Sequence, residues 1–133
     1  MKFREKNPPR TFEVGYDVKG YITDCGTVEL APDEQVTFTT PSGGEYDVTR
    51  KTWGFYATPS LNHRLAGFGL RAVLVKNRLN RFFVMLVESG KEALFLEYVR
   101  SEPLIIVSWM DTQDALDALS EAVTQKNFRD DKT

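Results

Sequence analysis

The sequence predicts an α+β domain: a mostly antiparallel sheet, or open barrel, of about six to seven strands, with two helices near the C-terminus. Three observations lead to this fold class. Apolar and polar residues alternate through much of residues 11–58, with turn residues between the alternating runs. Two very apolar segments follow between residues 70 and 87. After residue 89 the apolar residues recur at helical spacing instead.

The expected domain covers residues 11–125, between two polar ends. The length of 133 residues is that of one ordinary domain. Residues 1–10 are expected to form a mobile tail, because their charges alternate and Pro8-Pro9 fits neither a helix nor a central strand. Residues 126–133 are expected to form a polar C-terminal tail.

A cytoplasmic protein is expected. The start of the chain lacks the apolar stretch of a signal peptide, and no run of about 18 apolar residues could span a membrane. The only cysteine, Cys25, has no partner for an internal disulfide, which favours a reducing compartment.

The alternating runs predict short strands at 11–23, 27–31, 35–40 and 45–58. A turn is expected at residues 32–34, because proline favours the second position of a turn. A second turn is expected at the glycines 43–44, which can adopt positive φ angles. The fourth run is expected to end at Pro59, with Gly54 as a candidate break, and a loop is expected over 60–69.

The segments 70–76 and 81–87 are expected to form a hairpin in the middle of the sheet, because they are the most apolar part of the chain. A helix is expected over 91–101, where four apolar residues follow a helical spacing, with a capping box at Ser89 and Glu92. An alternative is a turn at 89–90 followed by another strand, but the apolar residues there do not alternate.

The continuous apolar run 104–109 is typical of a strand buried on both faces. With the preceding helix it would complete a strand–helix–strand unit with a right-handed crossover. A last helix is expected to begin at Asp111 or Thr112, with an apolar stripe that includes Leu116, Leu119 and Val123.

Positive charge is concentrated between Arg50 and Arg81. This segment holds seven Lys or Arg, no Asp or Glu, and the only histidine. The segments before and after it are acidic, and the net charge of the chain is −2. The segment can therefore bind an anion, whereas the near-neutral total charge argues against broad electrostatic binding of nucleic acid.

The sequence predicts a small soluble binding protein with a basic, aromatic cleft for an anionic small molecule such as a nucleotide or sugar nucleotide. The expected ligand-binding residues are Tyr46, Arg50, Trp53, Tyr56, His63 and Arg64. A guanidinium can hold a phosphate with two parallel hydrogen bonds, and an aromatic ring can stack on a base or sugar. The competing interpretation places the rings in the core and pairs the cations with acids of neighbouring strands, which is the commoner role of such residues.

Two other functions stay open. An accessory or assembly protein would use the basic segment to bind an acidic partner or a second copy in a homodimer. An enzyme would use His63 or Asp47 as acid or base, with Tyr46 or Arg64 stabilising charge. No metal or cofactor is expected, because one His and one Cys are too few for a zinc site and no phosphate-binding glycine motif follows a strand.

Overall fold

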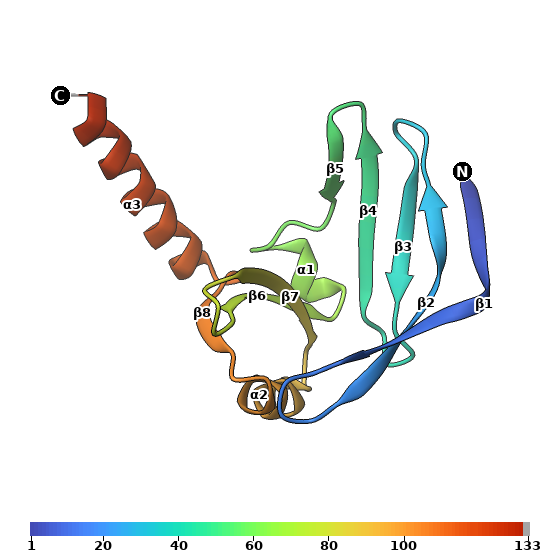
Figure 1. The fold of residues 1–133 in the computed structure, drawn as a ribbon. Coiled ribbons are helices and arrows are strands. Elements are labelled where there is room, and N and C mark those ends of the chain that lie inside the picture. Colours follow the sequence, from blue (N-terminus) through green and yellow to red (C-terminus); the bar gives the residue numbers. More distant parts are fainter. Residues whose placement is uncertain (132–133) are drawn as a thin grey trace.

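The computed structural model describes the backbone of residues 1–131 and the side chains of residues 1–125. This part of the chain has an α+β fold with eight strands in three antiparallel sheets and three helices (Figure 1). The strands are β1 (Lys2–Val14), β2 (Gly20–Glu29), β3 (Gln35–Thr39), β4 (Glu45–Lys51), β5 (Gly54–Ala57), β6 (Leu70–Lys76), β7 (Phe82–Glu88) and β8 (Ile105–Trp109). The helices are α1 (Arg64–Gly67), α2 (Glu92–Ser101) and α3 (Gln113–Asp131). The predicted class is confirmed, but the strands form neither one sheet nor a barrel.

β1 and β2 form a two-stranded ribbon that includes most of the expected N-terminal tail. The pairing register is interrupted between Glu5 and Arg10. Pro8 and Pro9 lie in this interruption, where the ladder requires no N–H from them. The prolines that suggested a tail are thus accommodated by an irregularity in a paired strand.

The run 11–23, expected as one strand, is divided between β1 and β2 by a turn that begins at Gly15. Gly15 has a φ of 107°, and a Cβ at this position would lie 2.2 Å from the carbonyl oxygen of Val18. Only glycine fits such a turn without strain. The chain therefore reverses direction here, although the alternation of apolar and polar residues continues across the turn.

The second sheet has the order β3-β4-β5. The single strand expected over 45–58 is a hairpin, because Lys51 pairs with Gly54 across a two-residue turn. Gly54 adopts a φ of 147°, which favours glycine, and this places Trp53 at the tip of the turn. The candidate break at Gly54 is therefore a full reversal.

The third sheet has the order β7-β6-β8, so the predicted hairpin 70–76 and 81–87 is confirmed. The hairpin was expected in the middle of the sheet, but only β6 is central and β7 is an edge strand. The helix predicted over 91–101 is confirmed as α2. It connects β7 to β8, which both run antiparallel to β6 and flank it. One face of the sheet packs against α2 through a core of Val73, Val75, Val87 and Phe95, extended by Met85, Val99, Leu104, Ile106 and Trp109.

The predicted capping box is not formed. The Glu92 carboxylate accepts a hydrogen bond from the backbone N–H of Gly90, at 2.6 Å, and the helix begins after Lys91. The Glu92 side chain therefore points back along the chain as predicted, but it accepts its hydrogen bond from Gly90 and not from Ser89.

A second core cluster lies on the other face of the same sheet. It contains Leu65, Leu70 and Ala72, against which Tyr46, Leu86 and Met110 pack. Leu65 belongs to α1, a one-turn helix in the segment expected to be a loop. This cluster joins the second sheet, through Tyr46, to the third.

α3 begins at the predicted position, because the hydroxyl of Thr112 accepts a hydrogen bond from the N–H of Ala115 at 3.2 Å. The helix extends away from the sheets (Figure 1). Its backbone continues to Asp131, so the expected tail from residue 126 is helical to that point, and residues 132–133 lie outside the described residues. No helix in the described part of the chain is both long and apolar enough to cross a membrane.

Candidate functional site

The aromatic rings predicted for the site lie at the surface of the β4–β5 hairpin. The side chains of Trp53 and Tyr56 are 70% and 45% exposed. Their ring centroids are 6.3 Å apart, with an angle of 31° between the ring planes. The competing interpretation, in which these rings belong to the core, is wrong for both.

Tyr46 and Arg50, which share one face of β4, have structural contacts. Tyr46 packs on the Leu65 cluster, and burial raises the pKa of its phenol. The Arg50 guanidinium donates a hydrogen bond of 2.9 Å to the backbone carbonyl of Leu30. Neither side chain is therefore a freely exposed binding group.

His63 and Arg64 lie at the start of α1, and both are exposed. The Arg64 guanidinium lies 5.4 Å from the centroid of the Phe68 ring. The Asp47 carboxylate accepts a hydrogen bond from the Thr37 hydroxyl, and no described contact joins it to His63. Of the six predicted residues, Trp53 and Tyr56 are the pair that the described contacts bring together.

A cavity of about 720 Å³, the Arg50 cavity, lies between the β4–β5 hairpin and the N-terminal end of the ribbon. It is lined by Met1, Lys2, Arg4, residues 27–32, Arg50, Lys51, Thr52, Gly54 and Phe55. Its positive groups are largely paired: Lys51 with Asp33, Arg4 with Glu29 at 3.4 Å, and the N-terminal amine with Glu34 at 3.0 Å. Of the basic segment, Lys51 is thus neutralised here by the acidic residues that precede it, whereas Arg50 bonds to a backbone carbonyl.

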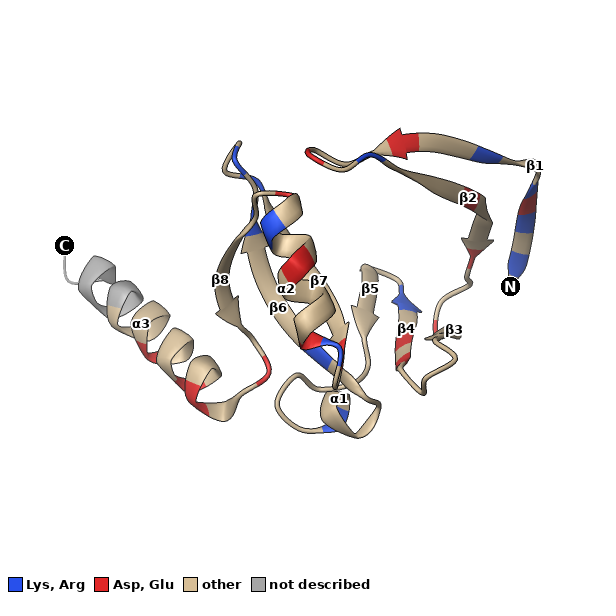
Figure 2. Ribbon diagram, turned by 90° about the horizontal axis from the view of Figure 1, so that it is seen from below, with Lys and Arg blue, Asp and Glu red and all other residues tan. Residues whose placement is uncertain are grey.

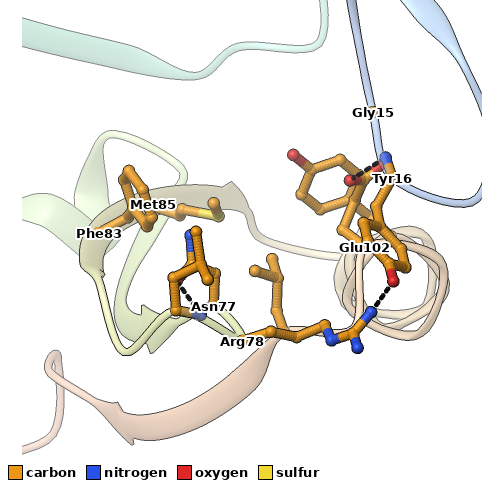
Figure 3. Close-up of a pocket in the computed structure, with 10 residues that line it drawn as sticks. Gly15, Tyr16, Asn77, Arg78, Phe83, Met85 and Glu102 are labelled. Atoms are coloured by element: carbon orange, nitrogen blue, oxygen red, sulfur yellow. Dashed lines mark hydrogen bonds between the residues drawn. The ribbon is translucent and has the colours of Figure 1, made fainter.

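A second cavity of about 710 Å³, the Arg78 cavity, lies where three distant segments meet (Figure 3). The turn between β1 and β2 supplies one wall, the β6–β7 hairpin another, and α2 with the residues after it a third. Its lining residues are Gly15, Tyr16, Asn77, Arg78, Leu79, Phe83, Met85, Tyr98, Glu102 and Leu104. Most of these side chains are apolar or aromatic.

Polar contacts hold the walls of the Arg78 cavity together. The backbone N–H of Tyr16 donates a 2.9 Å hydrogen bond to the carboxylate of Glu102. The Arg78 guanidinium lies 4.6 Å from the centroid of the Tyr16 ring and donates a hydrogen bond to its hydroxyl (Figure 3). Asn77 shapes the turn that carries Arg78, by accepting 3.0 Å bonds from the N–H groups of Leu79 and Arg81.

No family model, curated protein or solved structure matches this chain. Among the described residues, Arg78 has no carboxylate within ion-pair distance, unlike Arg4 and Lys51 in the Arg50 cavity. In the same part of the chain, no three His, Cys, Asp or Glu side chains gather where they could hold a metal ion.

None of the residues that line the Arg78 cavity was among the six ligand-binding residues predicted from the sequence. No local pattern marks this cavity, because its walls come from segments centred near residues 16, 80 and 100. The one usable signal was the concentration of apolar residues in the 70–87 hairpin, which shows that something must pack there.

A third cavity of about 290 Å³ lies between the second and third sheets, beside Tyr46 and Glu88. The Glu88 carboxylate accepts a hydrogen bond from the Ser42 hydroxyl and lies 3.4 Å from the Lys91 ammonium. The Ser42 bond, and after it a bond from Thr40, lower the pKa of Glu88 below its ordinary value of 4.5, with the charge of Lys91 adding to the effect. Ionised Glu88 therefore links the β3–β4 turn to β7.

Replacing Glu88 with glutamine should make the thermal stability less dependent on pH in the acid range. Because the folded-state pKa is lowered, the stabilisation by Glu88 is complete above its unfolded-state pKa and is lost as the pH falls through the folded-state value. Melting temperatures measured between about pH 7 and about pH 3 should fall more steeply for the wild type than for the variant. Exposed Glu97→Gln is the control, and parallel curves for wild type and Glu88→Gln would contradict the assignment.

Proposed function

We propose that the protein binds a small organic anion with a planar or apolar body in the Arg78 cavity. The observation that carries this proposal is a guanidinium, without a carboxylate partner among the described residues, beside a cavity lined by the rings of Tyr16, Phe83 and Tyr98. The volume of about 710 Å³ lies within the range of small-molecule sites. Such sites are mostly apolar, with a few polar groups that fix the orientation of the ligand.

The side chains of the Arg78 cavity suggest one role each. Arg78 would hold a phosphate or carboxylate group through charge-assisted hydrogen bonds, and this group would replace the Tyr16 hydroxyl as its partner. The rings would contact the flat part of the ligand, a contribution of about 1–3 kcal/mol per stacked base in nucleic-acid binders. The Glu102 carboxylate would accept a hydrogen bond from a ligand hydroxyl and would repel a second anionic group. Of the class expected from the sequence, nucleotides meet these requirements best, because their phosphate lies at one end of the molecule, whereas the diphosphate of a sugar nucleotide lies between two neutral groups.

Arg78→Ala should abolish or strongly weaken binding of such a ligand. Thermal-shift and equilibrium binding measurements with nucleotides, sugar nucleotides and sugar phosphates should give at least one ligand whose affinity falls with salt. Loss of a charge-assisted contact of about 1.5–3 kcal/mol corresponds to a roughly ten- to hundredfold weaker affinity in the Arg78→Ala variant. Arg81→Ala is the matched control, because it removes a charge from the same turn and does not line the cavity.

Three outcomes of this experiment are decisive. Loss of binding in Arg78→Ala, with Arg81→Ala unchanged, supports the Arg78 cavity. Loss of binding in Arg50→Ala instead would place the site in the Arg50 cavity, which one of the six predicted residues lines, and would contradict the proposal. The proposal also fails if no member of the panel binds.

A further inference from the structure

The described chain exposes far more surface than a compact protein of its mass. Its accessible surface is 9787 Å², whereas a compact monomer of 15.2 kDa exposes roughly 7,100 Å². The excess is roughly 2,700 Å², and a stable dimer needs only about 800 Å² from each partner. Among the described residues, 24 large hydrophobic side chains are exposed.

One such apolar surface is the face of the β7-β6-β8 sheet that α2 does not cover. We define this open face by Leu74, Lys76, Phe82, Val84 and Ile105, which alternate with the core residues and pair across the strands. The packed residues of the α1 cluster lie toward the other end of the same face. Phe82, Val84 and Ile105 are more than half exposed. Continuous apolar runs such as those of β6 and β7 are typical of strands buried on both faces, so the open face needs a cover.

α3 carries a second apolar surface without a partner. Ala115, Ala118, Leu119, Ala122 and Val123 recur at the spacing of one helix face. Leu119 and Val123 are about half exposed, and the helix extends away from the sheets (Figure 1). This stripe matches what the open face requires, namely a helix that would complete a layer opposite α2.

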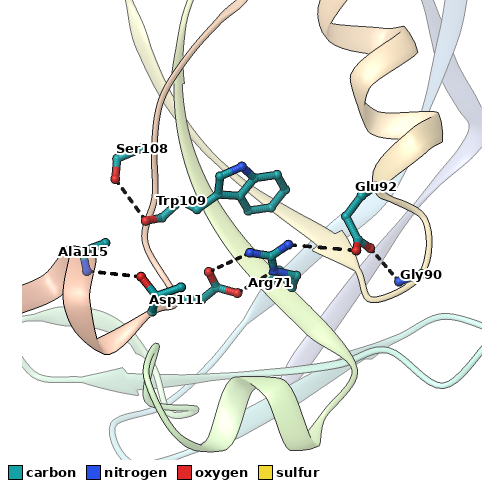
Figure 4. Close-up of polar contacts among 8 residues, drawn as sticks. Arg71, Gly90, Glu92, Ser108, Trp109, Asp111 and Ala115 are labelled. Atoms are coloured by element: carbon teal, nitrogen blue, oxygen red, sulfur yellow. Dashed lines mark hydrogen bonds and ion pairs between the residues drawn. The ribbon is translucent and has the colours of Figure 1, made fainter.

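The junction before α3 fixes the direction in which this helix leaves its own sheet (Figure 4). Arg71 in β6 donates hydrogen bonds of 2.8 and 3.4 Å to the two carboxylate oxygens of Asp111, two residues before the helix. Its guanidinium also lies 4.1 Å from the centroid of the Trp109 ring. With Asp111 held in this way, α3 extends away from the sheets (Figure 1) and leaves the stripe open to another molecule.

The charges around the two surfaces are complementary. The part of α3 over 113–125 holds Asp114, Asp117 and Glu121 and no Lys or Arg. The hairpin 74–87 holds only positive charges, and Figure 2 shows the opposite signs on the two elements. None of the eight ion pairs among the described residues includes Lys76 or Arg81.

We propose that two copies of this chain form a symmetric dimer in which α3 of each copy covers the open face of the other. The chain itself carries both complementary surfaces in equal number, and a twofold axis would satisfy both at once. Asp114 and Glu121, which border the stripe on α3, would lie near Lys76 and Arg81 of the second copy. This dimer is independent of ligand binding in the Arg78 cavity.

Light scattering after size exclusion, over a range of protein concentrations, tests the dimer. The wild type should have twice the chain mass of 15.2 kDa. Val84→Glu on the open face and Leu119→Glu on α3 should each weaken the dimer at least 100-fold. Val18→Glu is the matched control: Val18 is 67% exposed, against 68% for Val84, and lies in neither surface.

A charge exchange tests the contact without relying on apolar residues that could affect folding. Glu121→Lys and Lys76→Glu should each weaken the dimer, and the double variant should regain at least part of the loss, because Glu121 lies beside the stripe and Asp117 on the opposite side of α3. A wild type that is monomeric at every concentration would overturn the proposal. A dimer that Val84→Glu disrupts and Leu119→Glu leaves intact would also overturn it, because α3 would then not cover the open face. The same holds if the double variant dimerises no more tightly than the single variants.

Discussion

Leu65→Ala should lower the free energy of unfolding by about 2–5 kcal/mol, the range for large-to-small changes in a well-packed core. Leu65 has no exposed surface and is the residue through which α1 packs on the β7-β6-β8 sheet. The cost is expected near the upper end of this range, because the surrounding cluster of Leu70, Ala72 and Tyr46 joins two sheets and has little freedom to collapse. With a total stability of about 5–15 kcal/mol for a typical domain, this one change would remove much of it.

Denaturant unfolding of the wild type and the Leu65→Ala variant measures this effect. Both proteins should be compared at the same concentration, since association makes apparent stability depend on it. Leu94→Ala in α2 is the matched control: Leu94 is exposed, and alanine is at least as good a helix former, so its effect should stay within about 0.5 kcal/mol. Equal effects of the two substitutions would show that the Leu65 cluster does not hold the fold together.

Arg71→Lys should destabilise the protein by about 1.5–3 kcal/mol although it keeps the positive charge. Arg71 makes two hydrogen bonds to Asp111, lies 3.9 Å from Glu92 and stacks on Trp109. The hydrogen bond to Asp111, and the charges of both carboxylates, raise the pKa of the guanidinium. Lysine has neither the planar fork nor the flat face that these contacts require.

Urea unfolding of Arg71→Lys, Asp111→Asn and the double variant checks this prediction. If the ion pair is the source of the stability, the two single effects should not add, and the coupling between them should reach at least about 0.5 kcal/mol. Exposed Arg100→Lys in α2 should change little. Fully additive effects of Arg71→Lys and Asp111→Asn would show that contacts other than this ion pair stabilise the junction.

The elements that the sequence predicted well are those with one dominant local signal. The hairpin 70–76 and 81–87 and the helix 91–101 were found within a residue or two of their expected limits, because strong apolar runs and a helical spacing specify them. Local sequence signals gave wrong predictions where pairing with another strand overrides them. Pro8-Pro9 suggested a tail, but a partner strand accommodates them in a register shift.

The arrangement of strands into sheets could not be predicted, because alternation shows that a residue run is a strand and not which strand it pairs with. The site was harder still. Arg50, Trp53 and Tyr56 are near one another in sequence, yet Arg50 contacts a backbone carbonyl while the two rings lie exposed on the same hairpin. The Arg78 cavity depends on Tyr16 and Glu102, which meet only after folding.

The central place of β6 has a consequence for how this chain can change during evolution. β6 is paired on both sides, so an insertion or deletion of one residue in it would shift two registers together and move Val73 and Val75 away from α2. No strand of the β1–β2 ribbon pairs with another sheet, so its strands could change length in step without disturbing either core cluster, at the cost of moving Tyr16 relative to Glu102 and Arg78. Length variation that preserves the fold should therefore occur in the ribbon and not in β6 among descendants of this sequence.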